Sequence, residues 1–85
     1  MNRHVLGREP IEVKARFDEQ GNITPLEFVW KGSRIVAASV GRSWETAGER
    51  HILTLDLQAQ VYELIFVSAE GRWYLAPPKQ PLSKA

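Results

Sequence analysis

The chain has 85 residues and no cysteine, so it suits one domain with a modest core that neither disulfides nor thiolate zinc ligands stabilise. Its eleven basic and ten acidic residues give a net charge of +1, which argues against a dedicated binder of double-stranded DNA. No apolar run approaches the roughly 18–20 residues that span a bilayer, and no signal-peptide pattern follows the N-terminus, so we expect a cytoplasmic protein without membrane contact.

Residues 10–76 predict a single all-β domain, because apolar and polar residues alternate between closely spaced turns. Residues 1–9 are expected to form a flexible arm. Residues 77–85 are expected to form a flexible proline-rich tail, since proline lacks the amide donor that a central strand needs. Six strands are expected, over residues 11–17, 26–30, 34–40, 50–57, 61–67 and 72–76.

The first turns follow from glycine positions. Residues 18–22, Asp-Glu-Gln-Gly-Asn, predict a turn, and Lys31-Gly32 predicts a two-residue hairpin in which Gly32 takes a positive φ. That hairpin pairs Phe28 with Ile35. The first strand fits its neighbour less neatly, which indicates an irregularity near Pro25.

The register of the last three strands is predicted from two further turns. A two-residue turn at Gln58-Ala59 pairs Leu53 with Leu64, and a turn over residues 68–71 continues the same face. The resulting inner face comprises Leu53, Leu55, Tyr62, Leu64, Phe66, Trp73 and Leu75. The outer face is expected to carry Ile52, Val61, Ile65 and Tyr74, covered by the wrapping barrel, by the arm or by a partner. We therefore expect a small antiparallel, strongly curved sheet or half-open barrel of about six strands.

The sequence shows no catalytic constellation. His51 begins a strand on the inner-face parity and is expected to be structural, and His4 lies in the arm. Glu63 is expected on the outer face opposite Thr54, as a solvated carboxylate or, alternatively, as a partly buried one paired with an arginine such as Arg34 or Arg72. No spaced set of metal ligands and no glycine-rich phosphate loop occurs, so we expect no enzyme activity, metal or cofactor.

Trp44 lies in the longest expected connection, residues 41–48, where residues 43–50 are the best candidate for one short helical turn. It either plugs one end of the barrel or is an exposed anchor that stacks on a base or a peptide. Candidate partner-binding residues are Arg34, Arg42, Trp44, Arg50 and Arg72, because the arginines lie near strand ends or turns. A protein partner is favoured, and single-stranded nucleic acid is the alternative.

Five ordered segments resemble a bacterial family of small β domains of unknown function. They are Pro10-Ile-Glu-Val13, Pro25-Leu-Glu-Phe-Val-Trp-Lys-Gly32, Trp44, Val61-Tyr-Glu-Leu64 and Gly71-Arg-Trp-Tyr-Leu75. Members of that family occur alone and as C-terminal tails on Y-family polymerase-like proteins of mutagenesis cassettes. This sequence departs from the pattern at residues 35–38, where aromatic and basic residues are usual. The resemblance implies a non-enzymatic binding or accessory module linked to DNA damage tolerance, and the alternative is a protein–protein adaptor without nucleic-acid contact.

Overall fold

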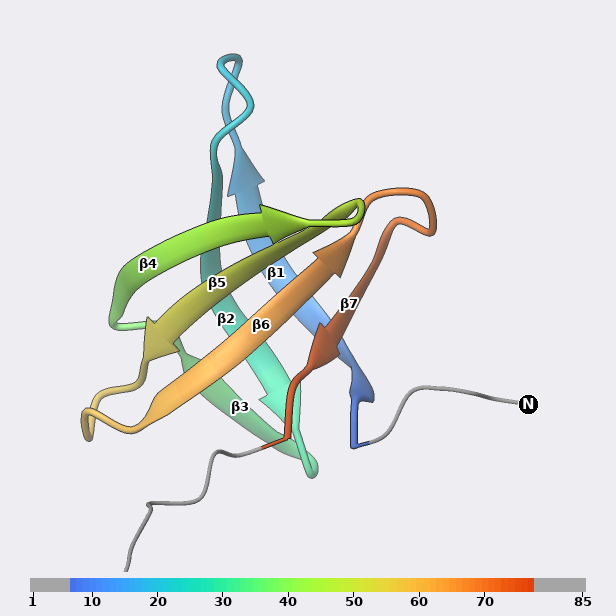
Figure 1. The fold of residues 1–85 in the computed structure, drawn as a ribbon. Coiled ribbons are helices and arrows are strands. Elements are labelled where there is room, and N and C mark those ends of the chain that lie inside the picture. Colours follow the sequence, from blue (N-terminus) through green and yellow to red (C-terminus); the bar gives the residue numbers. More distant parts are fainter. Residues whose placement is uncertain (1–6, 78–85) are drawn as a thin grey trace, which may run out of the picture.

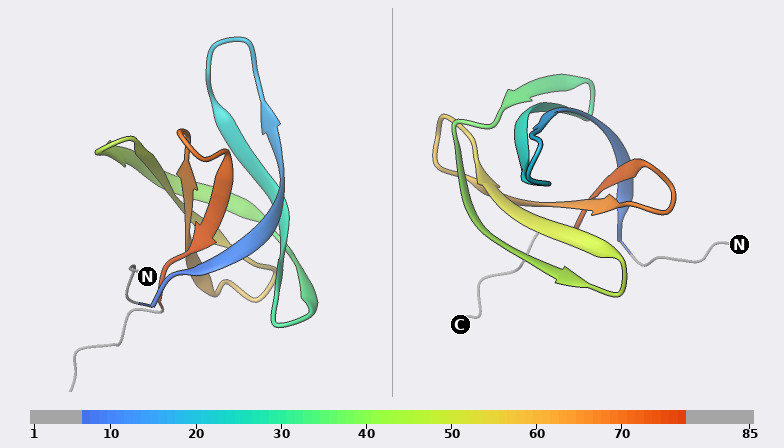
Figure 2. Two further views of the ribbon diagram at one scale, coloured as in Figure 1. Left: turned by 90° about the vertical axis from the view of Figure 1, so that its right-hand side faces the viewer. Right: turned by 90° about the horizontal axis from the view of Figure 1, so that it is seen from above.

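The computed structural model describes residues 7–77, which form one seven-stranded antiparallel sheet without a helix. Its strands are β1 (Glu9–Phe17), β2 (Ile23–Trp30), β3 (Ser33–Val36), β4 (Ser39–Thr46), β5 (Glu49–Leu55), β6 (Val61–Val67) and β7 (Arg72–Leu75). They lie in the order β3-β2-β1-β7-β6-β5-β4, and the sheet curls on itself (Figure 1 and Figure 2). The prediction of a strongly curved, half-open all-β barrel is confirmed, with seven strands instead of about six.

The described residues, 7–77, begin and end close to the expected boundaries of the domain, residues 10 and 76. β1 begins at Glu9 and Arg8 already contacts β5, so ordered contacts begin before residue 10. Most of the expected arm, residues 1–6, and most of the expected tail, residues 78–85, lie outside the described residues. Within residues 7–77, no helix is long and apolar enough to cross a membrane.

The barrel curls where the chain passes from β3 to β4. The Ala37 amide donates to the Leu26 carbonyl at 2.9 Å, and the Ala38 amide donates to the Leu55 carbonyl at 2.8 Å. Two consecutive amides thus bond to β2 and to β5, which lie near opposite ends of the strand order. A chain that changes strand partners in this way forms a barrel corner.

The prediction of one strand over residues 34–40 and a loop over 41–48 is therefore wrong. Residues 39–46 form the edge strand β4, and a hairpin at Ala47-Gly48, with φ of 48° and 81°, joins it to β5. No helical turn forms at residues 43–50, because both turn residues take the left-handed conformation that suits a two-residue hairpin.

Three predicted local features are confirmed. Lys31 and Gly32 take φ of 52° and 77°, and their hairpin pairs Phe28 with Ile35. The irregularity near Pro25 is a register shift after Lys14, which places Ala15 opposite Pro25. The pairing of Phe66 with Trp73 between β6 and β7 is also as predicted.

The predicted register between β5 and β6 is wrong by one residue. Leu64 lies opposite Ile52, and Glu63 lies opposite Leu53 instead of Thr54. A slip of one residue exchanges the two faces of a strand. Ile52 and Thr54 therefore point inward, whereas His51, which was expected on the inner face, points outward with Leu53 and Leu55.

The inner face holds the core. Its buried members are Phe28, Ile52, Leu64, Trp73 and Leu75, and residues of β1 and β2 pack against them. The outer face is not wholly exposed, because Ile65 is only 1% exposed and lies between His51 and Tyr74 in the register. Both faces of the central sheet therefore contain buried residues: the inner face packs against other apolar side chains, and on the outer face Ile65 has His51 and Tyr74 as neighbours.

Candidate functional site

The lower end of the barrel is open beside the first residues of β6. The ladder between β6 and β7 ends at Leu64 opposite Leu75, and the Ala76 amide still donates to the Glu63 carbonyl at 3.0 Å. Two prolines follow at positions 77 and 78, and proline cannot donate to a further ladder bond. β6 therefore extends past the end of β7, from Val61 to Glu63.

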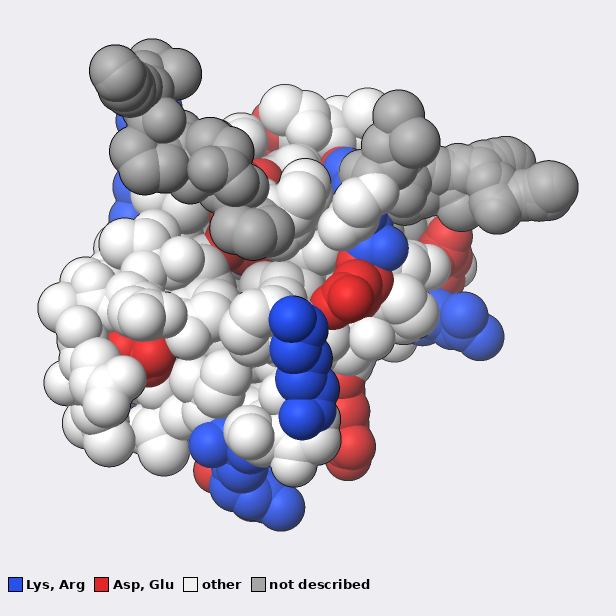
Figure 3. All heavy atoms as spheres, turned by 90° about the horizontal axis from the view of Figure 1, so that it is seen from below, with Lys and Arg blue, Asp and Glu red and all other residues white. Residues whose placement is uncertain are grey.

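A cavity of about 340 Å³ occupies this end of the barrel. Its lining is mostly apolar and includes Trp30, Leu53, Val61, Tyr62, Leu75 and Pro77. We call it the lower groove. Figure 3 views the molecule from this end and shows a surface built mainly of uncharged residues, on which several basic side chains lie beside acidic ones.

The Trp30 ring is fixed at the end of β2. Its indole Nε1 donates to Glu9 Oε1 at 2.8 Å, and the Lys31 ammonium lies 4.7 Å from the ring centroid. The centroids of the Trp30 and Tyr62 rings are 6.1 Å apart with an interplanar angle of 72°, an edge-to-face arrangement. Contacts with Glu9, Lys31 and Tyr62 thus fix the Trp30 ring in the apolar wall of the lower groove.

Tyr62 is anchored at its polar end as well. Its ring packs edge-on against Phe28, with 5.2 Å between centroids, and its hydroxyl donates to Asp56 Oδ2 at 2.9 Å. Burial, followed by the bond to Asp56, raises the pKa of Tyr62. The pKa of Asp56 is lowered, chiefly by the backbone amide of Gln60 that donates to its carboxylate. Tyr62 therefore presents a neutral, positioned ring at neutral pH.

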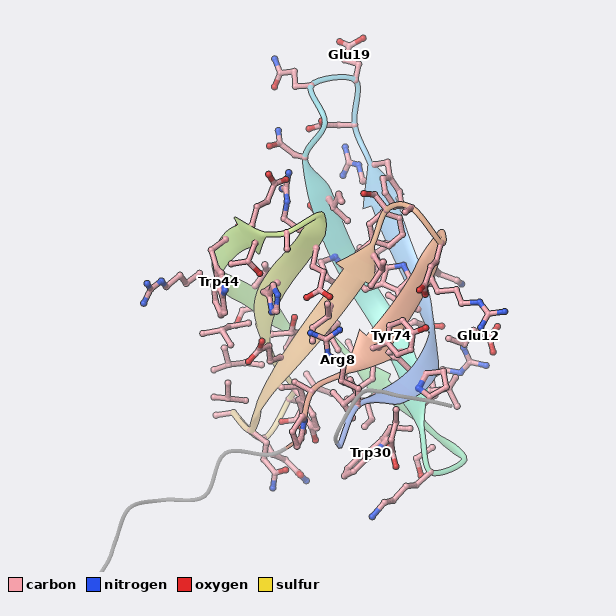
Figure 4. The ribbon with its side chains drawn as sticks, turned by 45° about the vertical axis from the view of Figure 1, so that its right-hand side comes forward. Arg8, Glu12, Glu19, Trp30, Trp44 and Tyr74 are labelled. Atoms are coloured by element: carbon pink, nitrogen blue, oxygen red, sulfur yellow. The ribbon has the colours of Figure 1, made fainter. Side chains whose placement is uncertain are left out.

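A second group of side chains, the outer ionic cluster, consists of Arg8, Glu49, His51 and Glu63. The Arg8 guanidinium forms two hydrogen bonds with Glu49, at 2.9 and 2.8 Å. This bond lowers the pKa of Glu49 and raises the pKa of Arg8. Because β7 and β6 separate β1 from β5, Arg8 crosses the outer face of the sheet, and Figure 4 shows it in front of β6.

His51 lies at the centre of this cluster and is 8% exposed. Its Nδ1 donates to Glu63 Oε2 at 2.6 Å, and its Nε2 lies 3.1 Å from Glu49 Oε1 and 3.3 Å from Thr46 Oγ1. Glu63 is thus paired with this histidine, and its charge also acts on Arg8. Among residues 7–77, no three histidine or carboxylate side chains are placed to hold a metal ion.

Trp44 covers this cluster instead of the barrel end. Its ring stacks on the His51 ring with 5.3 Å between centroids and an angle of 11°, and Arg42 lies 5.6 Å from its centroid. Trp44 is half-buried on β4, and Figure 4 shows it well away from Trp30. It is therefore neither a plug of the barrel nor an isolated exposed anchor.

The other candidate partner-binding residues do not join Trp44. Arg34 forms an ion pair with Glu27 on β2, and Arg50 forms one with Glu45 on the face opposite His51. Arg72 lies at the start of β7. Of the predicted set, Arg42 lies beside Trp44, whereas Arg34 and Arg50 are ion-paired with carboxylates, so the structure shows no single basic patch of these arginines around Trp44.

The sequence pattern does not reveal the lower groove, because Trp30 and Tyr62 follow the regular alternation of their strands. The signal that locates it is the pair of prolines after Ala76, because β7 ends there while the paired strand β6 still extends to Val61.

Comparisons with protein-family models, with curated proteins and with solved structures give no match to this chain. The resemblance to the bacterial β-domain family therefore stays a prediction.

Proposed function

We propose that this chain is a non-enzymatic binding module that holds an extended, apolar segment of a protein partner in the lower groove. The observation that carries the proposal is the aromatic wall of Trp30 and Tyr62 beside the part of β6 that runs past β7. A binding site of this kind is concave, mostly apolar and lined by a few fixed polar groups.

An extended peptide fits this place for two reasons. A strand edge can pair with added backbone, while alternate side chains of the added segment enter apolar pockets. Val61, which lines the groove, is 61% exposed, so apolar surface of the groove faces solvent. Exposed apolar surface that is contiguous with a groove commonly marks an interaction site.

Nucleic acid is less well supported than a protein partner. Base stacking needs a free ring face with cations around it. One face of the Trp44 ring is stacked on His51, and Arg42 is the one candidate arginine beside the ring, since Arg34 and Arg50 form ion pairs with carboxylates. From the resemblance we further propose that the protein partner acts in DNA damage tolerance.

The experiment is selection of a random displayed-peptide library on the full chain. We expect selected peptides with apolar residues at alternate positions. Val61→Asp should weaken their binding at least tenfold, because it places a charge in an apolar site; tenfold corresponds to about 1.4 kcal/mol. Leu26→Asp is the matched control, since Leu26 is 43% exposed and lies outside the groove.

Thermal unfolding establishes that both variants are folded. Binding that Val61→Asp weakens and Leu26→Asp leaves unchanged supports the lower groove. Selection of no peptide, or equal loss in both variants, removes the proposal.

A further inference from the structure

We infer that the open edge of β4 binds a second copy of this chain, which adds its own β4 in antiparallel orientation to form a symmetric dimer. In that pair, Arg42 of each copy lies opposite Glu45 of the other copy. The edge shares no residue with the lower groove, so this inference goes beyond the proposed function and does not depend on it.

The sheet leaves one side of β4 open. Within residues 7–77, β4 is last in the strand order and pairs only with β5, and Figure 1 shows it along the border of the sheet. Seven of its eight residues are exposed, and only Trp44 is half-buried. An edge strand presents backbone amides and carbonyls with which a strand of another chain can pair.

The two edge strands differ in how much they offer for pairing. β3, at the other end of the strand order, has four residues, and a short edge strand gives little backbone to pair with. β4 has eight residues, and its register is irregular only between Val40 and Ser43. Residues 43–46 pair regularly with β5, so the second half of β4 is straight enough for a further strand to add.

The charges of β4 are arranged symmetrically about the middle of this half. Arg42 precedes Ser43 and Glu45 follows Trp44, so an antiparallel self-pair centred between Ser43 and Trp44 places Arg42 opposite Glu45 twice. Opposite charges directly across an antiparallel pair are favourable, whereas like charges there are unfavourable. The strand has no other charged residue, so two copies of this edge do not repel each other.

The faces of the strand agree with this register. Arg42 lies beside the ring of Trp44, which is opposite His51 on the outer face, and Glu45 lies opposite Arg50 on the other face. Residues directly across an antiparallel pair point to the same side of the sheet. A two-fold axis in the plane of the combined sheet joins the outer face of one copy to the inner face of the other, which brings the two charges to one side.

Glu45 can accept a second arginine. Its side chain is 66% exposed, although its Oε2 already accepts from Arg50 at 2.6 Å. An ionised carboxylate has about four lone-pair sites on its two oxygens, so Arg42 of the second copy can donate to the sites that remain. Arg42 is exposed and lies 5.6 Å from the Trp44 ring centroid.

The contact is short, so the dimer is expected to be weak and to form only at high concentration. Pairing over residues 42–45 buries less than the roughly 1,200 Å² at which stable interfaces begin. A dimer nevertheless carries two lower grooves, and a partner with two apolar segments would bind it more tightly than it binds one groove.

Sedimentation equilibrium of the full chain at low salt should show a monomer–dimer equilibrium. Arg42→Glu and Glu45→Arg each place like charges opposite each other, so each variant alone should raise the dimer Kd at least tenfold. An equimolar mixture of the two variants should dimerise again, because every charge then meets its opposite. Arg34→Glu, the same change on the other edge strand, is the matched control and should leave the dimer unchanged.

Recovery in the mixture supports the inference and also shows that both variants are folded. A chain that stays monomeric at millimolar concentration overturns it. A dimer that tolerates both variants, that Arg34→Glu weakens equally, or that the mixture fails to restore overturns it as well. Peptides selected on the full chain should bind Arg42→Glu as they bind the wild type, so failure of the dimer leaves the proposed function standing, and failure of peptide selection leaves the dimer standing.

Discussion

The two faces of the central sheet are covered by different chemistry. On the inner face, Phe28, Ile52 and Leu64 are at most 1% exposed, and apolar side chains from facing strands cover them. On the outer face, Ile65 is equally buried, yet its register neighbours are His51 and Tyr74, and Arg8 crosses above β6. A small barrel can therefore bury both sides of a strand by adding an ionic cover to an apolar core.

This difference separates what stabilises the domain from what responds to solution conditions. Apolar burial changes little with pH or salt, whereas a partly buried ion pair depends on the charge state of both partners. The inner face should set the stability of the fold, and the outer face should adjust it.

The largest expected effect is that of Leu64→Ala. Leu64 is fully buried, and loss of a buried leucine costs about 3–5 kcal/mol through lost burial and the cavity left behind. That is a large share of the stability of a small domain. Ile65→Ala, one residue along but on the outer face, should cost about 2 kcal/mol because flexible polar cover relaxes into the space. Urea unfolding compares the two, and a larger loss in Ile65→Ala would invert the roles assigned to the faces.

Arg8→Met should lower the free energy of unfolding by about 1–3 kcal/mol at pH 7, because it removes a two-bond, partly buried ion pair and leaves Glu49 beside His51. Arg8 lowers the pKa of Glu49, so this stability is fully present above the ordinary glutamate pKa and is lost as pH falls through the lowered value. The difference between variant and wild type should thus shrink in acid. Arg34→Met is the control for an exposed arginine, and a difference constant from pH 7 to pH 2 would contradict the cluster.

Thr54→Val tests the weak point of the inner face. Thr54 is 0% exposed, and its Oγ1 has no hydrogen-bond partner among the described residues. A buried unpaired hydroxyl is costly, so the isosteric valine should stabilise the domain by about 1 kcal/mol. Calorimetry should show a higher Tm, whereas an unchanged or lower Tm would mean that the hydroxyl is paired in solution.

The smallest effect is expected in the loop that follows β5. Ala59 takes a φ of 64°, where Gly21 occupies the equivalent place in the loop after β1 with a φ of 86°. Ala59→Gly should relieve the left-handed strain but add freedom to the unfolded chain, for a net gain of about 0.5 kcal/mol. A loss of stability would show that the alanine methyl makes a contact worth more than the strain.

These two loops also explain which parts of the fold were predictable. In each, an aspartate carboxylate accepts amides two and four residues later, as Asp18 does from Gln20 and Asn22. The first loop is predictable because Gly21 marks its left-handed residue. The second loop has Ala59 at that position, so the sequence pattern indicates a two-residue turn, which shifts the expected register of β5 by one residue. Aspartate at the loop start was the signal available.

The candidate site was less predictable than the fold, because it depends on contacts distant in sequence. Lys31-Gly32 and the β6–β7 register follow from local alternation and were predicted correctly. The pairing of Arg8 with Glu49, across two intervening strands, has no local pattern. Trp44 drew attention by its place in an apparent loop, whereas Trp30, hidden in regular alternation, lines the groove.

The most direct test of the account is to compare the indole N–H signals of Trp30 and Trp44 in the full chain. Trp30→Phe and Trp44→Phe assign the signals, and the probes are a peptide selected on the full chain, with apolar residues at alternate positions, and an oligothymidine at low salt. We predict that the selected peptide shifts the Trp30 signal and leaves Trp44 unchanged, while oligothymidine shifts neither. A Trp44 shift on adding oligothymidine, with Trp30 unmoved by the selected peptide, would contradict the groove and restore nucleic acid as the ligand.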